Sequence, residues 1–534
     1  VMRRSVLVCG SIMLMLGSLS PGGPARAATW HLFGSNEIAV DHYRVTGDKN
    51  ASPYQFTGNF WNDRLSLHFD WDNQRGKTIS LQGELLGAHD DYFAEDGAVL
   101  STLSLKLQDG GVAVPFRFSV GDEFADLSRR ALQRQVRGAS LELQPQSKVV
   151  DQSILLVSGS GTSSWRETFN GHGNDLFFNG VSYLAASKSG RSSAVLNWVN
   201  VHQDAAVAAS SGGTVVGDHR IAGLFAETTL RGVHLEGEVA RLDRSHGGGS
   251  DRSFYGQLDE GRGRFRWRLR YEDNGQTFDP TGAVGIIPNR RIAEAHARWR
   301  GSRGELRARV QDIATDVSGS LPKRTTKVAA LSYQGSPLRR HPGFEVVLGG
   351  EVNDFSTEDG SLDQRFESYR LSLSDRLGSG WLARYRARYR RLEDHLLAEA
   401  SNHSLDHTLA VGRSFRAGSG RGAALQVQVG GTYRDQQGSG AYRRWSPSLD
   451  LGVVGRSHRL HLHLSFLRQD FRPLTVSDLT YSTQRLTYTF VAGPQVLTLE
   501  VGNELRRPEA ALKTDSLRAT VRYRWSFDVR GGDQ

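Results

Sequence analysis

Arginines at every second position are the residues of this sequence best placed to do chemistry. Side chains of a β-strand alternate between two faces, so each run puts its guanidinium groups on one face and large apolar side chains on the other. A lumen lined with arginines selects against cations. The candidate lumen-lining residues are Arg264, Arg266, Arg268, Arg270, Arg384, Arg386, Arg388, Arg390, Arg522 and Arg524.

Acidic and histidine side chains fall on the same inferred face as the arginines. Glu236 and Glu238 alternate in one segment, and Glu294 stands beside His296 and Arg298 in another. Three interpretations stay open. The residues could form a paired Arg–Glu network that holds a wide barrel round, an anion-attracting passage, or a cationic surface that docks an acidic partner.

Signatures of enzymes and metal sites are missing from the sequence. Neither G-x-S-x-G nor H-E-x-x-H occurs, and these are the patterns of serine hydrolases and zinc proteases. His461 and His463 share one strand face and could bind a metal, but two such histidines more often line a polar lumen. We therefore expect no enzyme activity, no catalytic residue, no cofactor and no metal site.

The arginine runs belong to segments whose alternation is typical of outer-membrane strands. The pattern recurs in 264–271, 381–390, 459–468 and 517–527, and such strands alternate over about ten residues. Reading along the chain, connections are alternately long and short, as in barrels with short periplasmic turns and longer extracellular loops. The sequence predicts an all-β fold, a single antiparallel transmembrane β-barrel of about 26 strands, within a range of about 20 to 26.

Composition and the N-terminal segment favour an exported membrane protein. The 534 residues are 38% hydrophobic and include 60 Gly and 14 Pro, and no run reaches the roughly 18–20 apolar residues of a spanning helix. Residues 1–27 have a basic start, an apolar stretch and an A-x-A end, so they are predicted to be a cleaved secretory signal. Cys9, the only cysteine, lies there, and the net charge falls from +9 to +6 without the segment's three arginines. We expect the barrel over 28–527 and a short tail over 528–534.

The last strand-like segment carries a family resemblance. Leu517, Val521, Tyr523, Trp525 and Phe527 alternate towards an aromatic end, which resembles the assembly signal of large Gram-negative outer-membrane β-barrels. That resemblance implies an outer-membrane location and, as partners, membrane lipid, lipopolysaccharide and the barrel-assembly machinery, with no nucleic acid. Residues 121–143 are similar to the "GD…RG" run in the barrels of pilus ushers.

The predicted width of the barrel frames its function. Barrels of more than about 18 strands usually hold something in the lumen. We expect a porin-like passage with an Arg-rich lumen. The chain also resembles two other kinds of large barrel: the porin-like sheath of porin–cytochrome conduits, which would enclose an electron-transfer cytochrome as partner, and export conduits for polysaccharide or lipid.

Overall fold

The chain folds into strands almost throughout. The computed structural model describes residues 28–531 apart from 50–51, 53–56, 74–75, 91–93, 162–164, 166–175, 205–216, 246–248, 262, 283–285, 316–321, 339, 379, 417–422, 473–477 and 509–512. The predicted signal segment and residues 532–534 therefore lie outside the described residues. The strands are β1(Thr29–Thr46), β2(Gly58–Asp72), β3(Lys77–Asp90), β4(Ala94–Asp109), β5(Phe116–Ser128), β6(Leu132–Leu143), β7(Val150–Ser160), β8(Leu176–Ser187), β9(Ser192–Gln203), β10(His219–Leu230), β11(Val233–Arg244), β12(Ser250–Glu260), β13(Phe265–Asn274), β14(Arg290–Arg300), β15(Gly304–Thr315), β16(Arg324–Gly335), β17(Glu345–Thr357), β18(Asp363–Asp375), β19(Trp381–Asp394), β20(Asn402–Arg416), β21(Ala424–Gly438), β22(Tyr442–Val454), β23(His458–Phe471), β24(Leu479–Ala492), β25(Gln495–Pro508) and β26(Thr514–Gly531).

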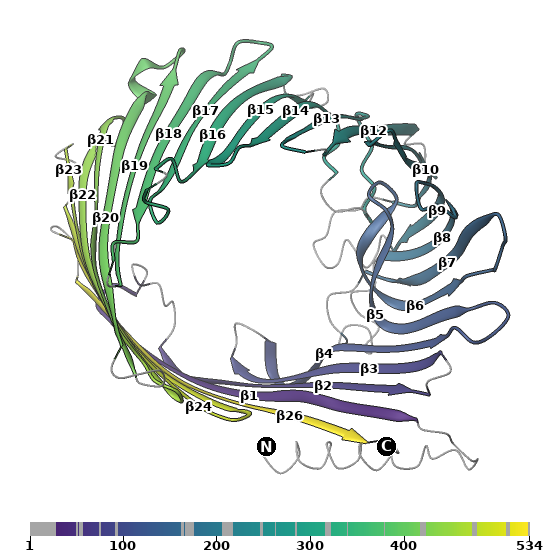
Figure 1. The fold of residues 1–534 in the computed structure, drawn as a ribbon, viewed down its shortest axis with the longest axis horizontal. Coiled ribbons are helices and arrows are strands. Elements are labelled where there is room, and N and C mark those ends of the chain that lie inside the picture. The colour runs from purple at the N-terminus through teal and green to yellow at the C-terminus, as the bar shows by residue number, and fades with distance from the viewer. Residues whose placement is uncertain are drawn as a thin grey trace.

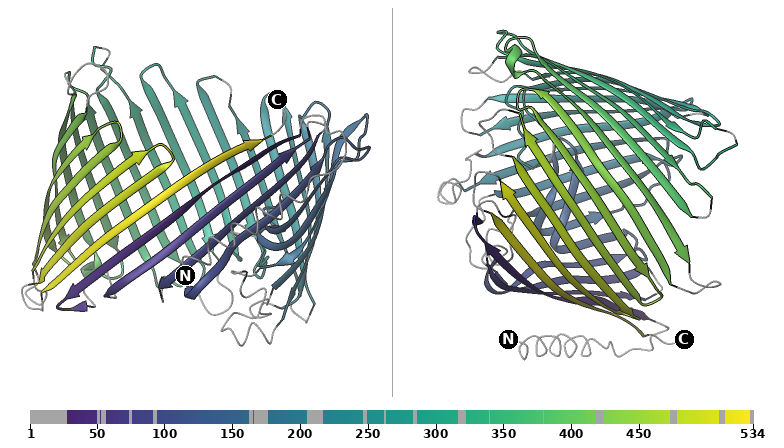
Figure 2. Two further views of the ribbon diagram at one scale, coloured as in Figure 1. Left: turned by 90° about the horizontal axis from the view of Figure 1, so that it is seen from below. Right: turned by 90° about the vertical axis from the view of Figure 1, so that its left-hand side faces the viewer.

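The strands form one closed barrel (Figure 1). Each strand pairs with its neighbours in sequence, and β26 pairs with β1 from Trp30↔Gly531 to Thr46↔Asp515. Closure removes the two sheet edges that would otherwise expose unpaired backbone groups to lipid. The prediction of a single antiparallel barrel of about 26 strands is confirmed, since the sheet has 26. Figure 2 shows the strands tilted against the barrel axis, as closure requires.

The two ends of the barrel differ in the length of their connections. Links such as 161–175, 204–218 and 275–289 join strands at one end, whereas links such as 231–232 and 301–303 join them at the other. These links follow the predicted alternation of long and short connections, but it is not general: the link 439–441 is short at the end of the long links, and the link 336–344 is long at the other end. Which end faces the periplasm stays a prediction.

The last strand is longer than expected. β26 continues beyond Phe527, and residues 528–531 still pair with the start of β1. The barrel boundary expected at 527 therefore moves to Gly531, because the first residues of the expected tail complete the closing strand pair. Besides the strands, the described residues contain a 3-10 helix at Ala398–Ala400, and they include no helix long and apolar enough to cross a membrane.

The outer face of the barrel is apolar and aromatic. Trp198, Trp299, Trp445 and Trp525 are each about half exposed although they sit in the middle or near the end of paired strands. Their strand neighbours point to the other face, so the outer surface forms the lipid-facing band of a membrane barrel.

One hairpin leaves the wall and enters the lumen (Figure 1). β5 pairs with β4 only as far as Gly121, and β6 pairs with β7 only from Arg137 onward, so among the described strands residues 122–136 form ladder pairs only with each other. We call residues 122–136 the inward hairpin. Its departure point needs glycine: Gly121 has a φ of +111°, and a Cβ there would lie 2.0 Å from the Leu103 carbonyl oxygen.

The hydrophobic core lies beneath the inward hairpin. Leu127, Leu132 and Val136 of the hairpin are buried against inner-wall side chains of the neighbouring strands. The wall side chains of this cluster include Val157, Phe178, Val199, Val201, Ile221, Ala240 and Leu242, and Phe278 joins them from the link 275–289. The hairpin thus adds a second packed layer over β7–β11, and Arg130 extends the contact to Ser253 of β12 and Glu272 of β13. We call β7–β13 the covered wall.

Candidate functional site: the inner wall

Strand pairing places most of the predicted arginines on one face of the sheet. Residues opposite each other in paired strands share a face. On β13, Arg268 opposes Asp259, and Glu272, two positions from Arg270, opposes Tyr255 beneath the inward hairpin. The same pairing carries the face from Arg268 through His296 to β15 and onward around the barrel. By this register Arg266, Arg268, Arg270, Arg384, Arg386, Arg388, Arg390, Arg522 and Arg524 share that face.

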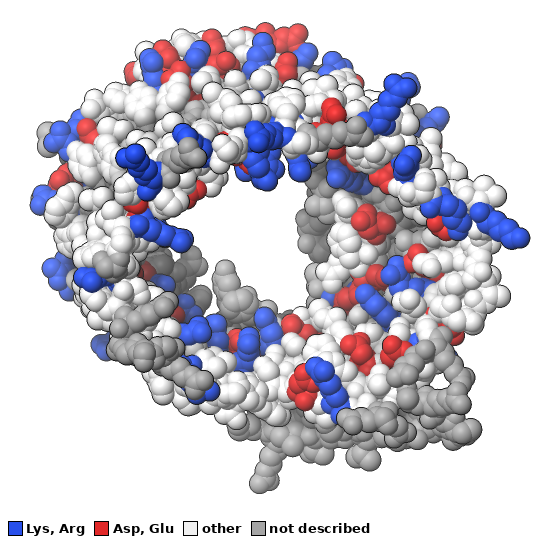
Figure 3. All heavy atoms as spheres, viewed as in Figure 1, with Lys and Arg blue, Asp and Glu red and all other residues white. Residues whose placement is uncertain are grey.

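Arg264 is the exception, because it precedes the strand. β13 begins at Phe265, and Arg264 lies in the turn, where its carbonyl oxygen accepts a hydrogen bond from the Arg300 backbone N–H at 2.7 Å. Figure 3 shows Lys and Arg side chains around the inner rim of the opening. That the shared face conducts anions stays a prediction.

Part of this face is hollowed into a groove with many arginines. The groove measures about 810 Å³ and lies over β14–β19, which we call the open wall. Gly349 forms the floor of the groove, and the Arg370 side chain lies directly over it: a Cβ at Gly349 would be 2.8 Å from Arg370 Nε. The charged and polar residues lining this arginine groove are His296, Arg307, Arg309, Ser332, Glu351, Ser368, Arg370, Ser372, Arg386 and Arg388.

Positive charge exceeds negative charge in the arginine groove. Arg309 is paired with Glu351 at 3.2 Å, and Arg307 is paired with Glu305. Among the described residues, Arg388 donates only to the Ser368 hydroxyl, at 3.4 Å. Within the described part of the chain, Arg370 and Arg386 form no ion pair, so the groove offers guanidinium groups to an incoming anion.

Elsewhere on the inner wall the predicted arginines are paired with acids. Arg270 pairs with Glu272 at 2.6 Å, and Arg522 pairs with Glu37 at 3.4 Å. Arg390 shares Asp406 with Arg434. These pairs match the Arg–acid network that the sequence left open as one interpretation, so the inner wall combines paired and unpaired arginines.

The most buried ion pairs hold the tip of the inward hairpin. The side chain of Arg130 is 1% exposed, and its Nη1 lies 3.5 Å from Glu238 Oε2 while its Nη2 lies 3.8 Å from Glu272 Oε1. Its Nε donates to Ser253 Oγ at 2.6 Å, and its guanidinium stacks 5.0 Å from the centre of the Tyr255 ring. Burying these charges is costly, and their pairing together with these further contacts offsets the loss of water.

The base of the inward hairpin carries a second buried ion pair. Arg137 Nε lies 2.7 Å from Asp122 Oδ1, and both side chains are 6% exposed. Asp122 Oδ2 also accepts hydrogen bonds from the Leu103 backbone N–H at 2.8 Å and from Trp165 Nε1 at 2.6 Å. The "GD…RG" run of the sequence is therefore the root of the hairpin, where two paired glycines permit the bend and Asp122 and Arg137 fix it.

The inward hairpin also meets the link after β13. The Gln133 backbone N–H donates to the Gly282 carbonyl at 2.9 Å, and Arg134 Nη1 donates to the Thr281 carbonyl at 3.2 Å. Phe278 of the same link is fully buried in the core cluster. Hairpin and link together thicken the covered wall on its lumen side.

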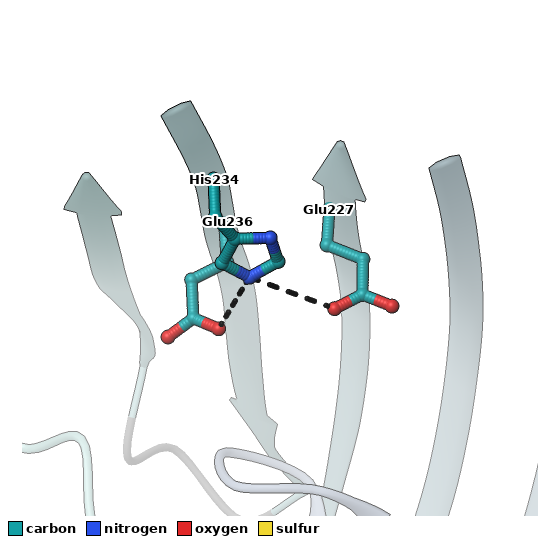
Figure 4. A group of neighbouring side chains, drawn as sticks. All are labelled: Glu227, His234 and Glu236. Atoms are coloured by element: carbon teal, nitrogen blue, oxygen red, sulfur yellow. Dashed lines mark ion pairs between the residues drawn. The ribbon is translucent and has the colours of Figure 1, made fainter. Parts of the chain in front are cut away.

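A histidine and two glutamates gather at one edge of the covered wall (Figure 4). Glu227 of β10 and His234 and Glu236 of β11 each turn one donor atom to the same point, within 4.8 Å of one another. The sequence predicted no metal site and singled out only Glu236. The tight link 231–232 could have revealed the group, because it fixes Glu227 opposite Glu236.

His461 and His463, the metal candidates of the sequence, lie together on β23 and share Asp450. His463 Nδ1 is 2.7 Å and His461 Nε2 is 3.5 Å from Asp450 Oδ1. The carboxylate is hydrogen-bonded to His463 and lies near His461, so the pair fits a polar inner wall.

Comparisons with known proteins agree with a barrel fold but name no relative. No protein-family model and no curated protein matches the chain. The P pilus usher (PapC) translocation pore is similar in structure, with a TM-score of 0.30 and 12% identity, over 92% of this chain and 99% of that one. Wzi, an outer-membrane, carbohydrate-binding barrel involved in group 1 capsule assembly in Escherichia coli, gives 0.34 and 10% over 60% and 81%.

A porin triple mutant of Rhodopseudomonas blastica gives a TM-score of 0.25 and 12% identity, over 61% of this chain and 94% of that one. The three are a translocation pore, a capsule-assembly protein and a porin. The closed antiparallel sheet and its apolar outer face are those of a large outer-membrane β-barrel.

Proposed function

We propose that the barrel is a porin-like passage across the outer membrane and that its arginine groove attracts anionic solutes. The observation that carries the proposal is the groove itself, in which Arg370 and Arg386 form no ion pair within the described residues and Arg388 meets only a hydroxyl. Fixed positive charge on one side of a passage raises the local concentration of anions and repels cations.

The covered wall has a complementary role in this passage. The inward hairpin occupies lumen space over the covered wall, so solutes pass along the adjacent open wall, which it does not cover (Figure 1). A passage that is narrowed on one side brings solutes within the reach of arginine side chains, where selectivity is strongest.

The experiment is the reversal potential of the purified chain in a planar bilayer under a salt gradient. The triple variant Arg370→Gln, Arg386→Gln, Arg388→Gln should lose most of the anion preference. Its expression, and the migration of the unheated, folded barrel in gel electrophoresis, should stay unchanged. The matched control is Arg391→Gln, Arg443→Gln, Arg468→Gln, which removes three arginines whose register puts them on the other face of the sheet. Equal reversal potentials for the wild type and the groove variant would refute the anion passage.

A second candidate function is a sheath around a partner chain. Figure 3 shows an opening through the middle of the barrel, and this opening is the observation that favours a sheath. The same preparation decides: erratic or absent currents from the lone chain, with a cytochrome or another protein bound in stoichiometric amount in the mass spectrum, would favour the sheath. A retained carbohydrate polymer would favour the export conduit.

A further inference from the structure

Two carboxylates oppose each other at the edge of the covered wall. Glu227 of β10 pairs directly with Glu236 of β11, and His234 precedes Glu236 by two positions on the same face. Like charges directly opposite each other on a sheet destabilise it unless a cation lies between them. The nearest candidate is His234, which lies between the two carboxylates in Figure 4.

His234 does not close this gap by hydrogen bonding. Its Nε2 is 3.6 Å from Glu236 Oε2 and 3.9 Å from Glu227 Oε2, beyond the range of about 2.7–3.2 Å for an N–H···O bond. Two ligands bound to one Zn²⁺ at about 2.0–2.2 Å stand roughly 3.4 Å apart in a tetrahedral site. The two distances from His234 are therefore close to those between metal ligands, and the two carboxylate oxygens lie within 4.8 Å of each other.

The second carboxylate oxygen of each glutamate is held by a hydrogen bond, and the second nitrogen of His234 lies near a hydroxyl. Ser193 Oγ donates to Glu227 Oε1 at 2.8 Å, and the Tyr255 hydroxyl donates to Glu236 Oε1. Thr229 Oγ1 lies 3.4 Å from His234 Nδ1. This leaves the two Oε2 atoms and Nε2 to converge, and outer partners of this kind are what orient ligands in metal sites.

We propose that Glu227, His234 and Glu236 form a binding site for a divalent transition metal ion of the Zn²⁺ and Co²⁺ class. A neutral imidazole with two carboxylates suits these ions, whereas Mg²⁺ and Ca²⁺ prefer oxygen ligands alone. Three protein ligands leave a fourth position open to water or a solute. The site is reachable, because His234 and Glu227 keep 33% and 41% of their side-chain surface exposed.

The site is connected to the tip of the inward hairpin. Tyr255, which holds Glu236, also lies 3.5 Å from Arg129 Nη1 through its hydroxyl and contacts the Arg130 guanidinium through its ring. Arg270, the other cation near Tyr255, is paired with Glu272. A bound metal fixes Glu236 and thereby Tyr255, so metal binding and hairpin docking should favour each other by the same factor.

The test is titration of the folded, tag-free barrel with Co²⁺. Isothermal calorimetry and the visible absorption of bound Co²⁺ monitor the binding, and Zn²⁺ is then added to displace the Co²⁺. The wild type should bind one ion per chain. His234→Ala and Glu227→Gln should each weaken binding at least tenfold, with loss of the visible band. Glu227→Gln conserves shape at a half-exposed position, so it still tests the site even if His234→Ala misfolds.

The matched control is His68→Ala, which removes a histidine that faces a single carboxylate, Asp70 at 3.0 Å. It should leave the affinity and the spectrum unchanged. Binding that survives in both site variants, or that falls equally in the control, would overturn the metal site. The metal site does not depend on the proposed anion passage, because the titration measures metal binding and not ion conduction.

Discussion

The covered wall and the open wall use the same residue type for opposite purposes. Arg130 is enclosed by Glu238, Glu272 and Tyr255 and is almost without solvent contact. Arg386, on the open wall, lines a groove and has no ion pair among the described residues. The difference is a second layer of protein: where the inward hairpin covers the strands, a charge must be paired, and where nothing covers them, water permits it to stay free.

This comparison separates stability from function on one sheet. A buried pair is strongly coupled, so the loss of one partner strands the other in a medium of low polarity. An exposed pair contributes little to stability because solvent screens it. Substitutions on the covered wall should therefore displace the hairpin, whereas substitutions on the open wall should change selectivity.

The largest effect is expected from Glu238→Ala, which leaves Glu272, at 3.8 Å, as the remaining acid paired with Arg130. Breaking a buried ion pair costs about 3–5 kcal/mol, and 1.4 kcal/mol is about tenfold in population. The displaced fraction of the hairpin should therefore rise at least a hundredfold. A thiol at the tip, Ser128→Cys, reports it through its labelling rate with a maleimide, because Cys9 is the only natural cysteine.

The paired measurement on the open wall is Glu351→Ala, which removes the partner of Arg309. Both side chains are more than a third exposed, so labelling of the Ser128→Cys thiol should not change. A similar acceleration by both substitutions would abolish the distinction between the walls.

A smaller effect is expected at the root of the inward hairpin, from Gly121→Ala. The positive φ costs about 1–3 kcal/mol for a residue with a side chain, and the new Cβ would meet the Leu103 carbonyl. Labelling of the tip thiol should rise about tenfold or more. The control is Gly190→Ala, which has a φ of +66° but no atom within 4 Å of its Cβ. If both alanines act alike, the bend at Gly121 is not what holds the hairpin in place.

The sequence predicted the barrel because its strands are regular. Alternation in segments such as 381–390 and 517–527 is a period-two signal that survives in every span, and closure follows once strands are many and helices absent. The inward hairpin was not predicted because residues 121–143 form a strand–loop–strand segment of the same kind as the wall hairpins. Only Gly121 and Gly138, placed opposite each other by the register, mark where the pair leaves the wall.

The functional groups were harder to predict than the fold. The arginine runs indicate the face but not which guanidinium groups are free, because that depends on acids of the neighbouring strand, such as Asp406 of β20 for Arg390 of β19 and Glu37 of β1 for Arg522 of β26. Arg130 and Arg370 stand outside the long arginine runs, so alternation alone gave no reason to select them. Ion-pair partners depend on the register between two strands, and the sequence of one strand alone does not determine that register.

A moderate effect on selectivity, with little on stability, is expected from Glu351→Gln. Removing the carboxylate frees Arg309 and adds one uncompensated positive charge to the arginine groove. An exposed pair contributes about 0–1 kcal/mol, so the urea midpoint of the barrel should stay nearly unchanged. The reversal potential should move towards stronger anion preference, opposite in sign to the shift from the groove arginines. Unfolding at lower urea with no change in selectivity would mean that this pair is structural.

The smallest effect is expected from Gly349→Ala in the floor of the arginine groove. The added methyl would meet the Arg370 side chain at Nε and Cγ, at 2.8 and 3.2 Å, and no backbone atom is as close. Because a flexible side chain can move aside, the barrel should fold normally, while Arg370 is pushed from the floor into the lumen. Single-channel conductance should fall slightly, since the groove becomes shallower, and anion preference should persist because no charge is lost. An unchanged conductance would mean that Arg370 does not need the space left by Gly349 to lie on the groove floor.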